Sequence, residues 1–248
     1  MMIVENADLH RMQRTFRSVL DAFAHPGTVQ NIELAPDNPL RPAALDAALE
    51  SAVRLFVDHA VTFGVADGES DVLAAYVSGE THSSRASVPD AEYVVVPARA
   101  DACTAHRAVA EACRGTLVAP EKGATLLMGC TRLAEAGCGS CEGKGDGPAM
   151  FAIEVRGPGV RDINRFAVDR IEWARARAAR NDEFPCGIEI LLVDADGRIV
   201  AIPRSSQVAC VNDGARSEDA MAGQGVAAKP AEREEAPRDA AALAGEVR

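Results

Sequence analysis

Along most of the chain, apolar residues alternate between a helical spacing and a strand spacing. The helical spacing predicts amphipathic helices over residues 8–24, 45–56, 71–79, 101–113 and 163–180. Alternating or continuous apolar runs predict strands over 28–34, 61–66, 91–96, 124–133, 149–155, 187–193 and 198–203. The turn residues His25-Pro26-Gly27 stop the first helix, and predicted strands and helices then alternate along the chain.

Two pairs of these strands are expected to form hairpins. Asp194-Ala195-Asp196-Gly197 joins 187–193 to 198–203, and an Asp-Gly pair between apolar runs is a strong hairpin signal. Strands 124–133 and 149–155 flank a glycine-rich stretch, and we expect them to pair in the same way. Alternating helices and strands with two antiparallel hairpins predict an α/β fold, with a three-layer arrangement of a mixed sheet flanked by helices.

The last part of the chain has a different composition. Residues 212–248 contain no aromatic residue, and they have few of the larger apolar side chains that a core requires. Such a segment cannot bury enough apolar surface to offset the entropy lost on ordering. We therefore predict a single α/β domain over 1–211 and a disordered Ala/Glu-rich tail over 212–248, with a short helix from Arg238 as the alternative for part of the tail.

Charge and hydropathy narrow the classes of partner. The 248 residues include 26 Lys plus Arg and 37 Asp plus Glu, a net charge of -11, which argues against binding nucleic acid by neutralising phosphates. No apolar run reaches the roughly 18–20 residues of a membrane helix. The first ten residues lack the basic and then apolar pattern of a secretory signal. We expect no membrane partner and a cytoplasmic location.

Metal and redox motifs are weak. The seven cysteines are odd in number and irregularly spaced, which indicates reduced thiols rather than a disulfide framework. Cys138 and Cys141 form a CxxC, but no second pair of ligands has a comparable spacing. A glycine-rich loop in which two cysteines fall near each other is the simpler interpretation, and we predict no metal site.

Three places carry candidate anion ligands. In 115–125, small residues precede Lys122 and Thr125, although a simple turn before a strand explains the same pattern. Arg204 follows the last predicted strand, and we rank it first because ligand sites of α/β folds open at strand ends. A solvated arginine is the alternative there. Arg17 shares a basic helix face with Arg11 and Arg14, a pattern typical of a solvated face or of a docking site.

Three blocks in order resemble one family, the PhnH subunit of the bacterial carbon-phosphorus lyase system for phosphonate use. They are TFRSVLDAFAHPG at 15–27, GTLVAPEKGATL at 115–126, and FPCGIEILL at 184–192 continuing to IPRSS at 202–206. This chain departs from the family pattern at Glu189, where Asp is usual, and at Ser205-Ser206, which replace a Thr pair. The extra methylene of Glu189 weakens any defined catalytic role for this candidate ligand. The glycine-rich loop and the tail are additions.

The resemblance implies a fold similar to the pyridoxal-phosphate transferases without the cofactor, a homodimer, and a complex with PhnG, PhnI and PhnJ. Proteins of this kind help PhnI, with PhnG and PhnL, to displace adenine from ATP by an alkylphosphonate. The product is ribose 1-phosphonate 5-triphosphate, whose carbon-phosphorus bond PhnJ cleaves. ATP or the alkylphosphonate would then bind at a shared site, and whether this subunit is itself catalytic stays open.

The lysine content agrees with the expected lack of cofactor. Pyridoxal phosphate requires a lysine for its Schiff base, and 1–211 contains only Lys122 and Lys144. The alternative function is a stand-alone transferase or an anion-binding dimer that uses a cleft around Arg204, with Arg17 or Lys122 holding the anion.

Overall fold

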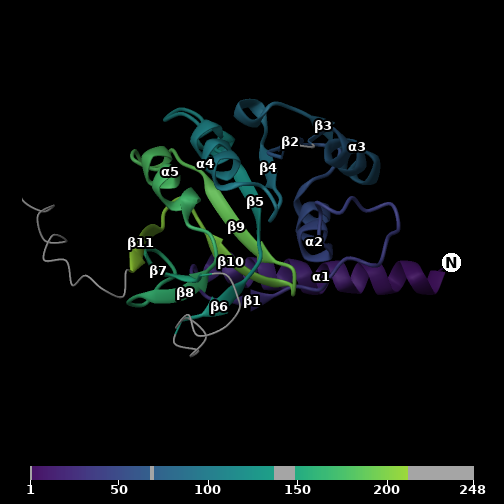
Figure 1. Ribbon diagram of the computed structural model, residues 1–248, viewed down its shortest axis with the longest axis horizontal. Helices are drawn as coiled ribbons and strands as arrows, with labels where there is room; N and C mark the ends of the chain where they lie inside the picture. The colour runs from purple at the N-terminus through teal and green to yellow at the C-terminus, as the bar shows by residue number, and fades with distance from the viewer. Residues whose placement is uncertain (1, 68–69, 137–148, 212–248) are drawn as a thin grey trace, which may run out of the picture. The chain divides into compact units, whose positions relative to one another are not determined.

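The computed structural model describes residues 2–67, 70–136 and 149–211. Its centre is a seven-stranded sheet in which a parallel portion continues into an antiparallel edge (Figure 1). The parallel strands β3, β2, β4, β5 and β9 lie side by side in this order, followed by the antiparallel β10 and β1. Their bounds in sheet order are Ser84–Arg85, Thr62–Val65, Tyr93–Val96, Thr125–Cys130, Glu189–Asp194, Arg198–Ile202 and Gln30–Asn31. The mixed sheet and the β9–β10 hairpin are as predicted.

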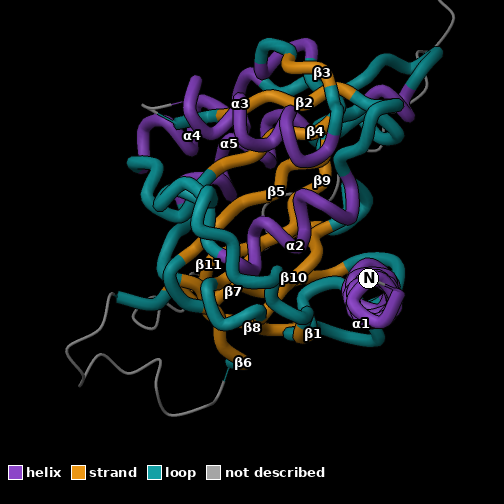
Figure 2. The backbone as a smooth tube through the Cα atoms, turned by 90° about the vertical axis from the view of Figure 1, so that its right-hand side faces the viewer, coloured by secondary structure: helices purple, strands orange, loops and turns teal. Residues whose placement is uncertain are grey.

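Helices cover one face of this sheet. They are α1 (Met2–Ala24), α2 (Ala47–Phe56) and α3 (Ser70–Thr81), and Figure 2 shows α1 end-on beside β1. Their apolar side chains join those of the strands in one core, to which Val95 and Leu127 contribute. Helix α2 begins where it does because the Asp46 carboxylate accepts a hydrogen bond of 2.7 Å from the Leu49 amide.

The opposite face carries a second core. Val94, Val96, Leu126 and Met128 point into it, so β4 and β5 are buried on both faces, as their continuous apolar runs require. Helices α4 (Ala102–Glu111) and α5 (Glu172–Arg180) pack here. The remaining cover is a four-stranded antiparallel sheet in the order β11-β7-β8-β6, with bounds Gln207–Val211, Phe151–Arg156, Asn164–Val168 and Leu133–Glu135.

The predicted hairpin of 124–133 with 149–155 is wrong. Strand β5 pairs in parallel with β4 and β9, whereas β7 pairs with β8 and β11 in the small sheet. Both edges of β5 are occupied inside the large sheet, so it has no edge left for β7. Strand β7 instead has one buried face, which carries Ile153 and Val155 into the second core. This alternation is typical of a sheet that packs on a core with one face.

The single long helix predicted over 163–180 is also wrong. Its first part is β8, in which Phe166 and Val168 are buried between β7 and β6, and only its second part is α5. Asp169 ends the strand by accepting hydrogen bonds from the backbone amides of Thr131 and Arg132 at 3.1 and 3.2 Å. The apolar spacing of this segment fits either a helix or a strand, and pairing with β7 and β6 makes its first part a strand. The edge strand β11 was not predicted from the sequence, and its apolar residues Val208, Cys210 and Val211 are exposed or only partly buried.

Two short 3-10 turns complete the domain, η1 (Val88–Asp90) and η2 (Pro120–Lys122). Within the described ranges, no helix is both long enough and apolar enough to cross a membrane. The predicted tail over 212–248 lies outside the described residues, as does the glycine-rich loop with Cys138 and Cys141.

Candidate functional site

Four of the five predicted ligand residues lie at one edge of the large sheet. Thr125 and Glu189 are the first residues of β5 and β9 and are paired in register. Lys122 ends η2, just before β5, and is exposed. Arg204 follows β10, and because β10 runs antiparallel to β9 its end lies at the same edge. The structure therefore brings these four residues together from distant parts of the sequence.

The Arg204 guanidinium is occupied by protein groups. Its Nε lies 3.1 Å from Glu189 Oε1, and its Nη1 donates to the Pro120 carbonyl. Asn181, at the end of α5, donates to the Arg204 carbonyl at 3.1 Å. These contacts tie η2, β9 and α5 to the turn after β10. Two of the five guanidinium N–H groups are used within the protein, and the Glu189 carboxylate already supplies a counter-charge to Arg204.

Arg17 is not part of this cluster. It is exposed on α1, a helix that packs against α2, β1 and β10. Its neighbours on the basic helix face are engaged, Arg11 with Asp8 at 3.0 Å and Arg14 with Glu33 at 2.8 Å. Surface pairs of this kind contribute little to stability.

The position of Arg204 also corrects the reason for ranking it first. Ligand crevices of α/β sheets open at the carboxyl ends of the parallel strands. Arg204 follows an antiparallel strand, so it lies where β5 and β9 begin. The sequence pattern could not reveal this, because strand direction is set by the order of strands in the sheet.

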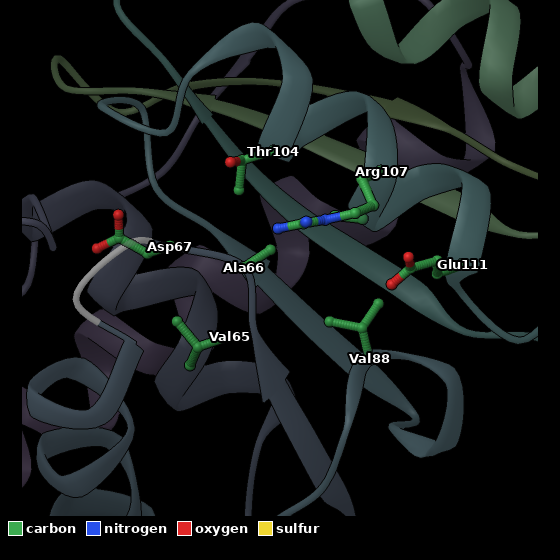
Figure 3. A pocket seen from close by; sticks show the side chains of 8 residues that line it. Val65, Ala66, Asp67, Val88, Thr104, Arg107 and Glu111 are labelled. Atoms are coloured by element: carbon green, nitrogen blue, oxygen red, sulfur yellow. The ribbon is translucent and has the colours of Figure 1, made fainter.

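The carboxyl edge has a pocket of its own, with a volume of about 300 Å³ (Figure 3). It lies where β2 and β4 are neighbours and their following helices, α3 and α4, go to opposite faces of the sheet. This is the topological switch point at which such sheets bind ligands. The pocket is lined by Val65, Ala66, Asp67, Val88, Thr104, Arg107, Ala108 and Glu111.

Charged groups surround this pocket. Arg107 extends from α4 across its opening, with Glu111 on the same helix and Asp67 on the far wall (Figure 3). Asp67 forms an ion pair with Arg99 at 2.6 Å, which links the segment after β2 to the segment after β4. Hydrogen bonds from Thr104 lower the pKa of Asp101, with a smaller contribution from the charge of Arg107. The pocket combines one cation with hydrogen-bond acceptors, which suits an anion that carries hydroxyl groups.

Two arginines of α5 and its preceding turn are buried, and sequence reasoning missed both because it placed them on one long helix. Arg170 donates to the carbonyls of Gly129 and Ala100 at 2.8 and 3.1 Å, and its Nη2 lies 2.6 Å from Glu172. Arg177 donates to the carbonyls of Ser206 and Pro203 at 3.1 and 2.5 Å. Arginine is rarely buried unless it is paired, so each has a structural or functional reason to be there.

Among the described residues, no group of three or more His, Cys, Asp or Glu side chains is placed to hold a metal ion. Burial raises the pKa of Cys130 well above its ordinary value, so this thiol is a core residue rather than a nucleophile.

The protein is thus an α/β protein with an arginine at each end of the parallel strands. Arg204 lies where the strands begin, and Arg107 lies at their carboxyl ends. The chain matches the family model described as bacterial phosphonate metabolism protein (PhnH) over residues 6–209. It therefore belongs to the PhnH family. It is also similar to HtxG of Stutzerimonas stutzeri, a protein whose name describes it as a C-P lyase subunit protein. The two are 28% identical over 203 residues, which cover 80% of this chain and 86% of the relative.

Proposed function

We propose that this protein is a subunit of a carbon-phosphorus lyase complex that acts on organophosphonates. The family match over nearly all described residues carries the proposal, and the name of the relative HtxG supports the assembly. In this role the chain acts with PhnG, PhnI and PhnL when ribose 1-phosphonate 5-triphosphate forms from ATP and an alkylphosphonate. The proposal includes a homodimer that contacts PhnG, PhnI and PhnJ. It also includes a cytoplasmic location and a backbone fold similar to that of the pyridoxal-phosphate transferases.

An apolar stripe on α1 supports a role in assembly. Leu9, Phe16 and Leu20 lie along one line of the helix and are each about half exposed, at 55%, 49% and 52%. The N-terminal half of α1, to which Leu9 belongs, extends beyond the sheet (Figure 1). Phe16 and Leu20 belong to the C-terminal half and are also exposed, so the stripe is open to a partner. Exposed apolar groups that gather on one surface are typical of interaction sites.

Co-expression tests the proposal. The chain, carrying a tag, is expressed with PhnG, PhnI and PhnJ from the same source, and the purified assembly is weighed by native mass spectrometry. We expect a defined complex, weakened by Phe16→Glu and kept by His10→Glu, a control that adds the same charge on another face of α1. Recovery of the chain alone, while the other subunits assemble without it, would reject the subunit role.

A nucleotide site on this subunit is best supported at the carboxyl-edge pocket. Arg107 suits a phosphate group, and Asp67 and Glu111 suit sugar hydroxyls. We expect ATP to bind the complex less tightly when Arg107 is replaced by Gln. His106→Gln, at an exposed neighbouring position, is the control.

The stand-alone transferase centred on Arg204 is not favoured. Glu189 already supplies a counter-charge to that guanidinium, so an anion there would have to compete with this carboxylate. Turnover by the isolated protein that is lost in Arg204→Ala would restore this alternative.

A further inference from the structure

A second cleft lies between α5 and the turn that leads into β11. Its volume is about 240 Å³. Helix α5 contributes one face, on which the small side chains of Ala174 and Ala178 leave room beside Arg177. The other wall comes from Ser206, Gln207 and Val208, and Asn181 closes the end next to the Arg204 turn.

Two polar atoms in the walls of this cleft lack hydrogen-bond partners. Within the described residues, Arg177 Nε and Ser206 Oγ are both buried and unbonded, and their residues are only 3% and 4% exposed. The Nη1 and Nη2 atoms of Arg177 each donate to a carbonyl, so the side chain is fixed in place while its Nε–H is unused. Native proteins rarely leave a buried donor or hydroxyl without a partner, and such groups call for a missing ion, water or ligand.

The charge of Arg177 is also incompletely balanced. Both of its hydrogen-bond acceptors are neutral carbonyls. Burial lowers the pKa of Arg177 to about 10, and the more distant charge of Glu189 offsets this only in part. Glu189 is itself paired with Arg204. A positive charge in such surroundings favours an anion, because the low local dielectric strengthens the attraction.

We infer that the cleft between α5 and β11 binds a small tetrahedral oxyanion, a phosphonate or a phosphate, through Arg177 Nε and Ser206 Oγ. The two donors come from different elements, and the several oxygens of a tetrahedral anion can accept from both. Ala174, Ala178 and Val208 supply an apolar wall that suits the alkyl group of an alkylphosphonate. The oxyanion site rests on these residues, whereas the preference for a phosphonate over a phosphate rests on the proposed function.

Calorimetric titration of the full chain with methylphosphonate and with inorganic phosphate tests the inference. We expect saturable binding by the wild-type protein, weakened about tenfold by Ser206→Ala, which removes one hydrogen bond to a charged ligand. Arg177→Gln is expected to abolish it. Ser205→Ala and Arg175→Gln, at neighbouring positions that do not line the cleft, are the matched controls and should bind as the wild type does.

The Ser206→Ala variant keeps the test decisive even if Arg177→Gln fails to fold. Removing an unbonded hydroxyl leaves no new group unsatisfied, so this variant is expected to fold. Absence of saturable wild-type binding at millimolar concentrations, or unchanged binding by Ser206→Ala, would overturn the site. Equal affinity for both anions would overturn the phosphonate preference alone.

Anion binding and complex formation by the wild-type chain, measured side by side, separate this inference from the proposed function. If the wild-type chain joins the complex with PhnG, PhnI and PhnJ but binds neither anion, the inference fails and the subunit role stands. If the chain binds methylphosphonate but never joins the complex, the site stands and the subunit role fails.

Discussion

Arg204 is part of the turn between β10 and β11, and Arg177 donates hydrogen bonds to two carbonyls of the same turn. The two arginines differ in whether a carboxylate balances their charge. Arg204 faces a carboxylate, Glu189, at 3.1 Å, so its charge is neutralised within the chain. Among the described residues, Arg177 donates to two carbonyls and to no carboxylate, and its Nε is unused next to a cleft. An arginine in a segment that resembles a family motif therefore need not bind a ligand. Whether it is available for an anion depends on whether a carboxylate of the protein already balances its charge.

Arg170 provides a third case, because it too is buried and held by carbonyls. Unlike Arg177, it has a carboxylate partner, Glu172, at 2.6 Å. Arg170 and Arg177 are the buried arginines among the described residues, and Arg177 is the one without an adjacent carboxylate. The comparison therefore predicts that Arg170 and Arg204 are structural, whereas Arg177 serves a ligand.

The largest expected effect comes from Arg170→Met. The substitution leaves the Gly129 and Ala100 carbonyls and the Glu172 carboxylate without their partner. We expect the free energy of unfolding to fall by about 3–5 kcal/mol, the cost of breaking a buried pair from one side. Urea unfolding measures it, with exposed Arg175→Met as the control. A loss below about 1 kcal/mol would mean that Arg170 is not structural.

Glu50 is a buried carboxylate with hydrogen-bond partners on the other face of the sheet, and its effect on stability can be compared with that of the buried arginines. Burial acts to raise the pKa of Glu50, but hydrogen bonds from Tyr76, Arg41 and Arg54 outweigh it and hold the pKa below its ordinary value. A carboxyl whose pKa is lowered by folding stabilises the protein above the unfolded pKa and loses this contribution as the pH falls through the folded value.

We therefore expect Glu50→Gln to lower the free energy of unfolding by about 2 kcal/mol at neutral pH, because a buried charge-assisted network loses its charge. The difference from wild type should shrink as the pH falls below 4.5. Unfolding curves at a series of pH values measure it, with Glu135→Gln at an exposed position as the control. A difference that grows on acidification would contradict the assigned direction.

A smaller effect is expected for the pair of Arg204 and Glu189. Both side chains are about one fifth to one quarter exposed, at 20% and 25%, so solvent weakens their attraction. A double-mutant cycle with Arg204→Met and Glu189→Gln is expected to give a coupling energy of about 1 kcal/mol. The equivalent cycle for Arg177 and Glu189 should give less, because no direct contact joins them. A larger coupling energy for Arg177 with Glu189 than for Arg204 with Glu189 would contradict the conclusion that Glu189 balances the charge of Arg204 rather than that of Arg177.

The smallest effect is expected for Ser206→Ala without any anion. Because the Ser206 hydroxyl is buried and unbonded, its removal should leave the stability unchanged or raise it by up to about 1 kcal/mol. Thermal unfolding in an anion-free buffer measures it, beside Ser205→Ala. A clear loss of stability would show that the hydroxyl has a partner within the protein.

Local sequence predicted much of the fold correctly. Helices α1, α2 and α4 and strands β2, β4, β9 and β10 follow apolar patterns and turn residues that act over a few positions. The segment 163–180 failed because one apolar spacing fits either a helix or a strand followed by a helix. Its first half became a strand because it pairs with β7, the preceding element, and with β6, which lies earlier in the sequence.

The sequence by itself determined the family and the α/β class, because three ordered blocks and local periodicity carry that information. That Thr125, Glu189 and Arg204 are neighbours followed only from the pairing of the strands. Only the tertiary structure decided which arginines have a counter-charge. It paired Arg204 with Glu189 across 15 positions and left Arg177 Nε unbonded beside Ser206. The physical reason is that burial and ion pairing depend on which strands become neighbours, and the pairing of strands is a non-local property of the chain.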